Sequence, residues 1–74
     1  MGRMDNTHAI TADIVHRASN PTTKREAFIR HNREWGEYIV QHFEDGKYLH
    51  KADYYTPDWD DAHDTANHWL RETL

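Results

Sequence analysis

Histidine and aspartate are the side chains of this sequence with the clearest capacity for chemistry, because both can bind metal ions. Seven histidines are present, and the best local pair is Asp64 and His68, four residues apart on one face of a predicted helix with Asp61 beside them. Such a set could bind zinc, cobalt or nickel. However, no histidine pair has the His-x3-His spacing, and no HExxH motif occurs. We therefore favour an exposed acidic helix face without a metal, and keep a His/Asp metal-binding domain as an alternative.

Catalytic groups are sparse in this chain. Ser19 is the single serine and lies outside any nucleophile-elbow motif. The three glycines form no phosphate-binding loop, and the lack of cysteine removes thiolate nucleophiles, disulfides and Cys-ligated metals. We therefore expect a protein that is not an enzyme and that needs no cofactor.

Length and composition predict one small domain over residues 1–74, with a flexible start at residues 1–9. Hydrophobic residues make up 36% of the chain, so we expect a thin core in which three Trp and four Tyr supply much of the area. No apolar run approaches the roughly twenty residues of a membrane helix, and the N-terminus lacks the apolar stretch of a signal peptide. We expect a cytoplasmic monomer that makes no membrane contact.

Charge is distributed unevenly along the chain, whose formal net charge is −4. Residues 1–35 carry six basic and four acidic side chains, whereas residues 36–74 carry three basic and nine acidic ones. An acidic balance argues against unaided binding to a phosphate backbone, which requires several uncompensated cations. The asymmetry instead allows different faces of the domain to meet partners of either charge.

Two helices are predicted before residue 36. The first spans residues 8–18 and ends before Pro21, because a residue that precedes proline is pushed out of the helical region. Apolar residues alternate at positions 10, 12 and 14, so a strand is the alternative there. Thr23 and Glu26 form a capping-box pattern, which predicts a second helix over residues 24–35.

A β-hairpin is predicted around Asp45-Gly46, a dipeptide typical of two-residue turns. Residues 37–44 and 47–55 would form its strands. The turn would pair Phe43 with Tyr48, Gln41 with His50, and Ile39 with Ala52. We expect that face, extended by Tyr54, to cover the core. The opposite face would hold Tyr38, Val40, His42, Leu49, Lys51, Asp53 and Tyr55.

The last predicted element is a C-terminal helix. Thr56 suits the N-cap, and Pro57 suits the first helical position, where its missing N–H costs nothing. At helical spacing, one narrow stripe holds Trp59, Ala62, Ala66, Trp69, Leu70 and Thr73. The predicted fold is therefore a small α+β domain: two N-terminal helices, a hairpin and a C-terminal helix.

Direct nucleic-acid binding is one functional alternative. Two helices joined by a short Asn-Pro turn resemble the outline of a helix-turn-helix, and the second would carry Arg25, Arg30 and Arg33. We name these three arginines as candidates to face nucleic acid. Acidic neighbours dilute this basic surface, so a protein partner that positions it beside RNA is the better hypothesis.

A protein-interaction module is the class we favour. A short hairpin in so small a domain leaves a sheet edge that can accept a peptide strand. Four side chains on the second hairpin face would form an unusually apolar surface in water, and such patches often mark contacts. These candidate partner-binding residues are Tyr38, Val40, Leu49 and Tyr55. The alternative is that the N-terminal helices cover this face.

Two stretches carry a resemblance to a known family. Residues 20–43, NPTTKREAFIRHNREWGEYIVQHF, and residues 53–63, DYYTPDWDDAH, resemble the small RNA polymerase regulators of lytic Xanthomonas phages. The resemblance implies a non-enzymatic protein in the host bacterial cytoplasm that binds the N-terminal segment of the polymerase β′ subunit. It also implies contact with the flap of the β subunit near the RNA exit channel, with nascent RNA nearby. Inhibition of host promoter use and antitermination would follow.

Overall fold

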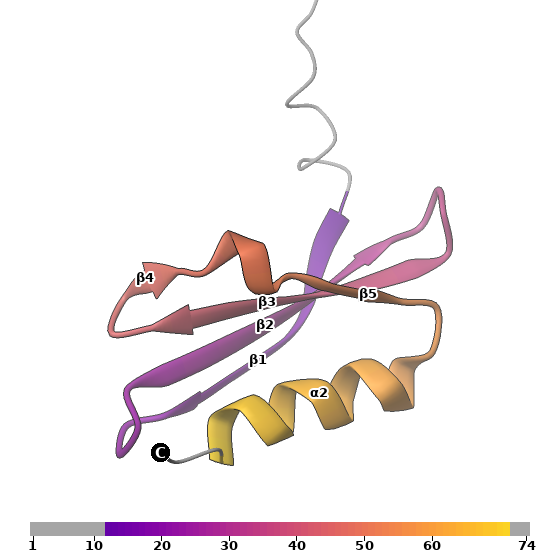
Figure 1. Ribbon diagram of the computed structural model, residues 1–74. Helices are drawn as coiled ribbons and strands as arrows, with labels where there is room; N and C mark the ends of the chain where they lie inside the picture. The colour runs from indigo at the N-terminus through magenta and orange to yellow at the C-terminus, as the bar shows by residue number, and fades with distance from the viewer. Residues whose placement is uncertain (1–11, 72–74) are drawn as a thin grey trace, which may run out of the picture.

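The computed structural model describes residues 12–71 and shows an antiparallel sheet with one helix packed on one face (Figure 1). The elements are β1 (Ala12–Asn20), β2 (Arg25–Asn32), β3 (Glu37–Glu44), β4 (Lys47–Tyr48), a 3-10 turn η1 (His50–Ala52), β5 (Tyr54–Thr56) and α2 (Trp59–Arg71). The strand order is β1-β2-β3-β4, and β5 pairs with β3 farther along the same edge. The predicted flexible residues 1–9 lie outside the described part of the chain.

The two predicted N-terminal helices are wrong, because this part of the chain forms the strands β1 and β2. Ala18 pairs with Ala27, and Asn20 pairs with Arg25, across the turn that contains Pro21. The strand that was the alternative for residues 8–18 is what the fold forms from Ala12 onward, although a register shift between Ile14 and His16 interrupts the alternation. The helix-turn-helix alternative is lost with these helices.

The core lies between the sheet and α2. Ile29 of β2 and Val40 of β3 are directly paired and fully buried. Ala62 and Ala66 of α2 are buried against them, and these small side chains let the helix approach the sheet closely. The buried apolar set within residues 12–71 is Ala27, Ile29, Val40, Ala62, Ala66 and Leu70. No helix among these residues is long and apolar enough to cross a membrane.

The predicted turn at Asp45-Gly46 is confirmed, together with the pairing of Phe43 with Tyr48. Both turn residues have positive φ angles, +53° and +80°, as a tight hairpin turn requires. After Tyr48 the strand breaks into η1, so the predicted pairing of Ile39 with Ala52 is wrong. Ile39 pairs with Tyr55 of β5 instead.

The core-facing side of the hairpin is also the reverse of the prediction. Val40 and His42 face α2 and are buried, whereas Gln41 and Phe43 lie on the other face of the sheet. The apolar side chains Ala62 and Ala66 of α2 pack against the face of β3 that carries Val40. The prediction placed the more apolar face of the hairpin against the core. It was wrong because the core side includes a polar residue, His42, which is buried.

The predicted C-terminal helix is confirmed, but its cap lies two residues later than expected. The first helical hydrogen bond runs from the Ala62 N–H to the Asp58 carbonyl oxygen at 3.0 Å. The Asp58 carboxylate accepts from the Asp60 N–H at 3.1 Å, so Asp58 is the N-cap. Thr56 accepts from the Asp58 N–H at 3.2 Å and thereby fixes the chain before the helix.

The β1–β2 turn satisfies carbonyl groups at the end of α2. Asn20 Nδ2 donates to the Leu70 carbonyl oxygen at 2.8 Å, and Thr23 Oγ1 donates to the same oxygen at 3.3 Å. Arg25 donates to the Trp69 carbonyl oxygen at 3.1 Å. The last carbonyls of a helix have no partner within the helix, so these contacts replace water there. Thr23, predicted to begin a helix, instead helps to end one.

Candidate binding surface

The sheet face opposite α2, which we call the open face, is the candidate functional surface. Strand register places its members side by side: Arg17 opposite Phe28, Glu26 opposite Phe43, and Ile39 opposite Tyr55. No α-helix of residues 12–71 covers this face, and the 3-10 turn η1 lies next to β3 on the side away from α2 (Figure 1). Its apolar and aromatic members are Ile14, Phe28, Ile39, Phe43, Tyr48 and Tyr55.

An aromatic row crosses the open face from β2 to β4. The ring centroids of Phe28 and Phe43 are 4.9 Å apart, and those of Phe43 and Tyr48 are 5.1 Å apart. The Arg17 guanidinium lies over the Phe28 ring, 5.8 Å from its centroid, and extends the row onto β1. Tyr48 stacks on Phe43, whereas the Phe28 ring is tilted by 38° to Phe43. Aromatic pairs of this kind add stability beyond the area that they bury.

Polar groups tie the aromatic row to the 3-10 turn. Arg30 donates to Gln41 at 2.8 Å, and Gln41 donates to the Tyr48 hydroxyl at 3.2 Å. That hydroxyl in turn donates to the Asp53 carboxylate at 2.5 Å. Burial and then the hydrogen bond to Asp53 raise the pKa of Tyr48, so the phenol stays protonated. The chain of bonds fixes the ring at the edge of the open face.

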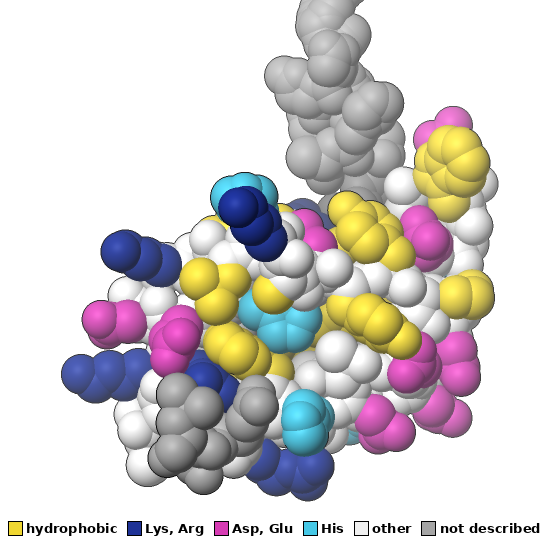
Figure 2. Space-filling view, viewed as in Figure 1, with side chains coloured by type: hydrophobic (Ala, Val, Ile, Leu, Met, Phe, Trp, Pro, Cys, Tyr) yellow, Lys and Arg dark blue, Asp and Glu magenta, His cyan; other side chains and the backbone are white. Residues whose placement is uncertain are grey.

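Much of the apolar area on the open face is in contact with solvent. Tyr55 is 55% exposed, Ile14 is 42% exposed and Tyr48 is 41% exposed. A contiguous surface of large apolar side chains is a common mark of an interaction site. Figure 2 shows many acidic side chains where α2 begins, while Lys and Arg lie mainly toward the turns and the end of that helix. Glu26, opposite Phe43, is an acidic member of the open face itself.

The predicted partner-binding residues do not share one surface. Tyr38 and Val40 face α2, where the Tyr38 ring contacts the Trp59 ring at 5.4 Å and Val40 is fully buried. Leu49 is half-buried beside η1. Tyr55 alone among the four lies on the open face and is strongly exposed. The alternative, that the N-terminal helices cover this face, is wrong because those residues form strands; α2 covers Tyr38 and Val40 instead.

The predicted nucleic-acid-facing arginines also separate. Arg25 is buried on the α2 side, Arg30 is on the open face with Gln41, and Arg33 lies in the exposed turn after β2. Arg33 forms an ion pair with Asp13 at 2.9 Å. These three residues therefore form no common basic surface.

The histidines and aspartates form no obvious metal centre within residues 12–71, where no group of three or more potential ligands is suitably placed. Asp61, from the predicted helical set, accepts a hydrogen bond from the Tyr54 hydroxyl at 2.6 Å. Asp64 and His68 are exposed on α2. Two histidines that do contact each other are His16 and His63, whose ring centroids are 5.2 Å apart.

A scan against protein-family models found no match to this chain, and searches of curated proteins and of solved structures found none either.

Sequence reasoning missed the main members of the open face. The signal that could have found them was the turn at Asp45-Gly46, which correctly placed Phe43 beside Tyr48. The contact of Phe28 with Phe43 could not be predicted, because residues 24–35 were predicted to form a helix. Once β2 pairs with β3, Phe28 lies opposite Gln41 and beside Phe43.

Proposed function

We propose that this protein is a non-enzymatic binding module that docks a protein partner on its open face. The partner we propose is bacterial RNA polymerase, contacted at the N-terminal segment of β′ near the β flap and the RNA exit channel. By occupying this surface, the protein would inhibit host promoter use and promote antitermination. A regulator of this kind needs no turnover, because binding alone shifts the balance between polymerase states.

The observation that carries the docking proposal is the exposed apolar surface around the aromatic row. One face of the sheet is already used by α2, whereas the opposite face presents Phe28, Phe43 and Tyr48. The exposed ring of Tyr55 lies on the same face, opposite Ile39 and farther along β3. Aromatic side chains are enriched at protein interfaces because they bury a large area with little loss of conformational freedom. The choice of polymerase as partner comes from the resemblance of residues 20–43 and 53–63 to phage regulators.

The docking proposal is tested with purified bacterial RNA polymerase and the full chain. We expect the wild-type protein to bind polymerase and to lose affinity about tenfold in Tyr55→Ala, which removes an exposed ring from the open face. The matched control is Trp35→Ala, because Trp35 is 76% exposed in the turn after β2, outside the open face. Thermal melting of both variants verifies that each is folded.

Binding to polymerase that lacks the β′ N-terminal segment tests which part of the polymerase is contacted, separately from which face of this protein makes the contact. Loss of binding to the truncated enzyme would support the β′ contact, whereas undiminished binding would remove it. Equal effects of Tyr55→Ala and Trp35→Ala would overturn the assignment of the open face. No binding to intact polymerase would overturn the proposed partner.

A further inference from the structure

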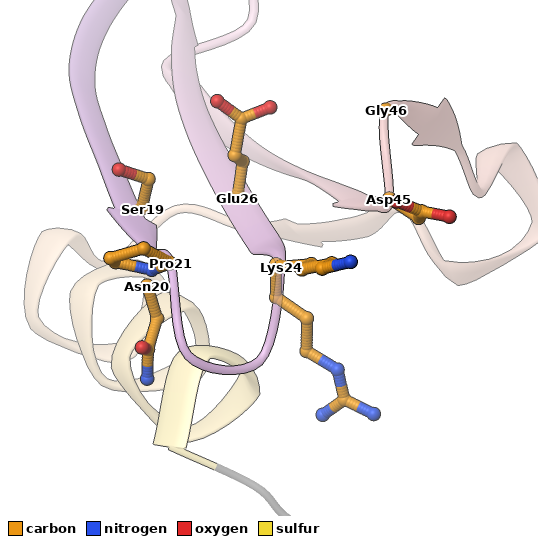
Figure 3. Close-up of a pocket in the computed structure, with 8 residues that line it drawn as sticks. Ser19, Asn20, Pro21, Lys24, Glu26, Asp45 and Gly46 are labelled. Atoms are coloured by element: carbon orange, nitrogen blue, oxygen red, sulfur yellow. The ribbon is translucent and has the colours of Figure 1, made fainter.

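A depression beside the β1–β2 turn is lined by charges of both signs (Figure 3). Lys24 and Arg25 lie there together with Glu26 and Asp45, so charge selects no ligand for it. A more specific arrangement lies on the α2 side of the sheet, where two histidine rings meet between the edge strand β1 and the helix.

His16 of β1 and His63 of α2 lie next to each other, with ring centroids 5.2 Å apart and ring planes inclined by 57°. Strand register places His16 opposite Ile29, a core residue, so its side chain is on the helix side of the sheet. The Trp59 ring contacts both, at 6.0 Å from His16 and 5.6 Å from His63. Both histidines are half-buried, so an ion in solution can reach them.

The separation of the two rings fits a shared zinc ion. Two imidazoles that bind one tetrahedral zinc through bonds of about 2.0–2.1 Å have ring centroids roughly 5 Å apart. Planes inclined by 57° can aim one nitrogen each at a common point, which parallel stacked rings cannot do. Imidazole is a preferred ligand of zinc, and tetrahedral coordination is typical of it.

Asn67 is placed to orient the His63 ring. It lies one helical turn after His63, and its side-chain Nδ2 is 3.3 Å from Nδ1 of the ring. A histidine that binds a metal usually makes a hydrogen bond through its other ring nitrogen. With the Asn67 amide turned so that its oxygen accepts from the Nδ1–H, the Nε2 lone pair of His63 is left for zinc.

Charge around His63 also favours a cation. Asp60 and Asp64 lie close to it along α2 and are exposed, and the chain carries a net charge of −4. We therefore propose that His16 and His63 together bind a zinc ion between β1 and α2. No group of three potential protein ligands is suitably placed among residues 12–71, so water completes the coordination. Zinc is accordingly held less tightly than in a four-ligand structural site.

The zinc ion joins two elements that meet only at the margin of the core. Within residues 12–71, β1 is an edge strand that pairs with β2 alone, and α2 packs mainly against β2 and β3. Zinc between His16 and His63 therefore ties the edge strand to the helix. It stabilises the fold from the α2 side and leaves the open face available, so this inference is independent of the proposed polymerase contact.

The test titrates the full chain with zinc chloride at pH 7.5, because histidine binds metal only when it is unprotonated. Nuclear magnetic resonance follows the imidazole signals of all seven histidines. We expect the His16 and His63 signals to shift together and to saturate at one zinc per chain. Because zinc binds the folded state, the melting temperature should rise by about 5 °C at a tenfold excess over the dissociation constant.

His16→Gln and His63→Gln should each weaken zinc binding by about tenfold, since each removes one of two protein ligands. His68→Gln is the matched control, because His68 is an exposed histidine farther along the same helix. It should leave the affinity and the rise in melting temperature unchanged. Thermal melting without zinc verifies that each variant is folded.

Three results would overturn the zinc site. The two ring signals could saturate at different zinc concentrations, zinc could shift other histidines and not this pair, or His68→Gln could weaken binding as much as His63→Gln. The first two are decided by the wild-type titration, so they do not depend on the folding of any variant. Absence of any shift at millimolar zinc would also reject the site.

Discussion

The guanidinium of Arg25 lies 3.9 Å from the centroid of the Trp69 ring, which joins the first residue of β2 to the last turn of α2. The same side chain donates to the Trp69 carbonyl oxygen and forms an ion pair with Glu44 at 3.5 Å. Arg25 is only 6% exposed, so these contacts replace the water that the charge has lost. One arginine thus fixes the end of the helix against the sheet.

Arg25→Ala should lower the free energy of unfolding by about 2–3 kcal/mol, because it removes a desolvated cation–π contact and a charged hydrogen bond. Urea denaturation measures the change. The matched control is Arg33→Ala, whose exposed ion pair with Asp13 should be worth less than about 1 kcal/mol. Equal losses in the two variants would contradict the role given to Arg25.

Val40→Ala and Ile39→Ala compare the two faces of β3 directly. Val40 is fully buried under α2, so its truncation should cost about 2 kcal/mol from lost transfer energy and the cavity left behind. Ile39 is half-buried on the open face and should cost about 1 kcal/mol. Thermal or urea unfolding measures both. A larger loss for Ile39→Ala would mean that the two faces are reversed.

His42 should make the protein less stable in acid. Burial lowers its pKa below the ordinary value of 6.5, and this effect exceeds the opposing influence of Asp53. Above pH 6.5 both folded and unfolded states hold a neutral ring. As the pH falls below that value, the unfolded chain takes up the proton first, so stability is lost.

The His42 contribution is measured by urea unfolding between pH 7.5 and 5. His42→Gln should reduce the dependence of stability on pH, whereas His50→Gln, at an exposed residue, serves as the control. The comparison concerns the change with pH, because burial of an amide at position 42 also alters stability at every pH. An unchanged pH dependence in His42→Gln would refute this prediction.

Gly46→Ala should cost about 1 kcal/mol, because its φ of +80° disfavours any residue with a Cβ. An added Cβ would meet no atom within 4 Å, so the cost comes from the backbone alone. Gly46→Asn should recover part of the loss, since asparagine tolerates this region better. Urea unfolding of both variants measures the difference. A steric explanation would require the larger asparagine to be worse.

The sequence predicted the elements whose signals are local. Asp45-Gly46 specified a turn and the pairing of Phe43 with Tyr48. The spacing of Ala62, Ala66 and Leu70 specified the buried side of α2. Both depend on residues close together in the chain, so tertiary contacts did not need to be known. The sequence predicted that one face of the hairpin would be unusually apolar. Of the four residues named for that surface, Tyr55 is the one that lies on the open face.

Tertiary structure alone decided the identity of β1 and β2 and the face of the sheet that α2 covers. The core side of β2 holds Ala27 and Ile29 but begins with Arg25, and Phe28 lies on the other face, so the apolar residues do not alternate cleanly. The capping-box pattern at Thr23 then favours a helix. Arg25 becomes a core residue because Trp69, far along the chain, supplies a ring and a carbonyl oxygen. A charged side chain can be buried only where it finds partners of this kind. Those partners come from distant parts of the chain, so the sequence near Arg25 does not reveal them.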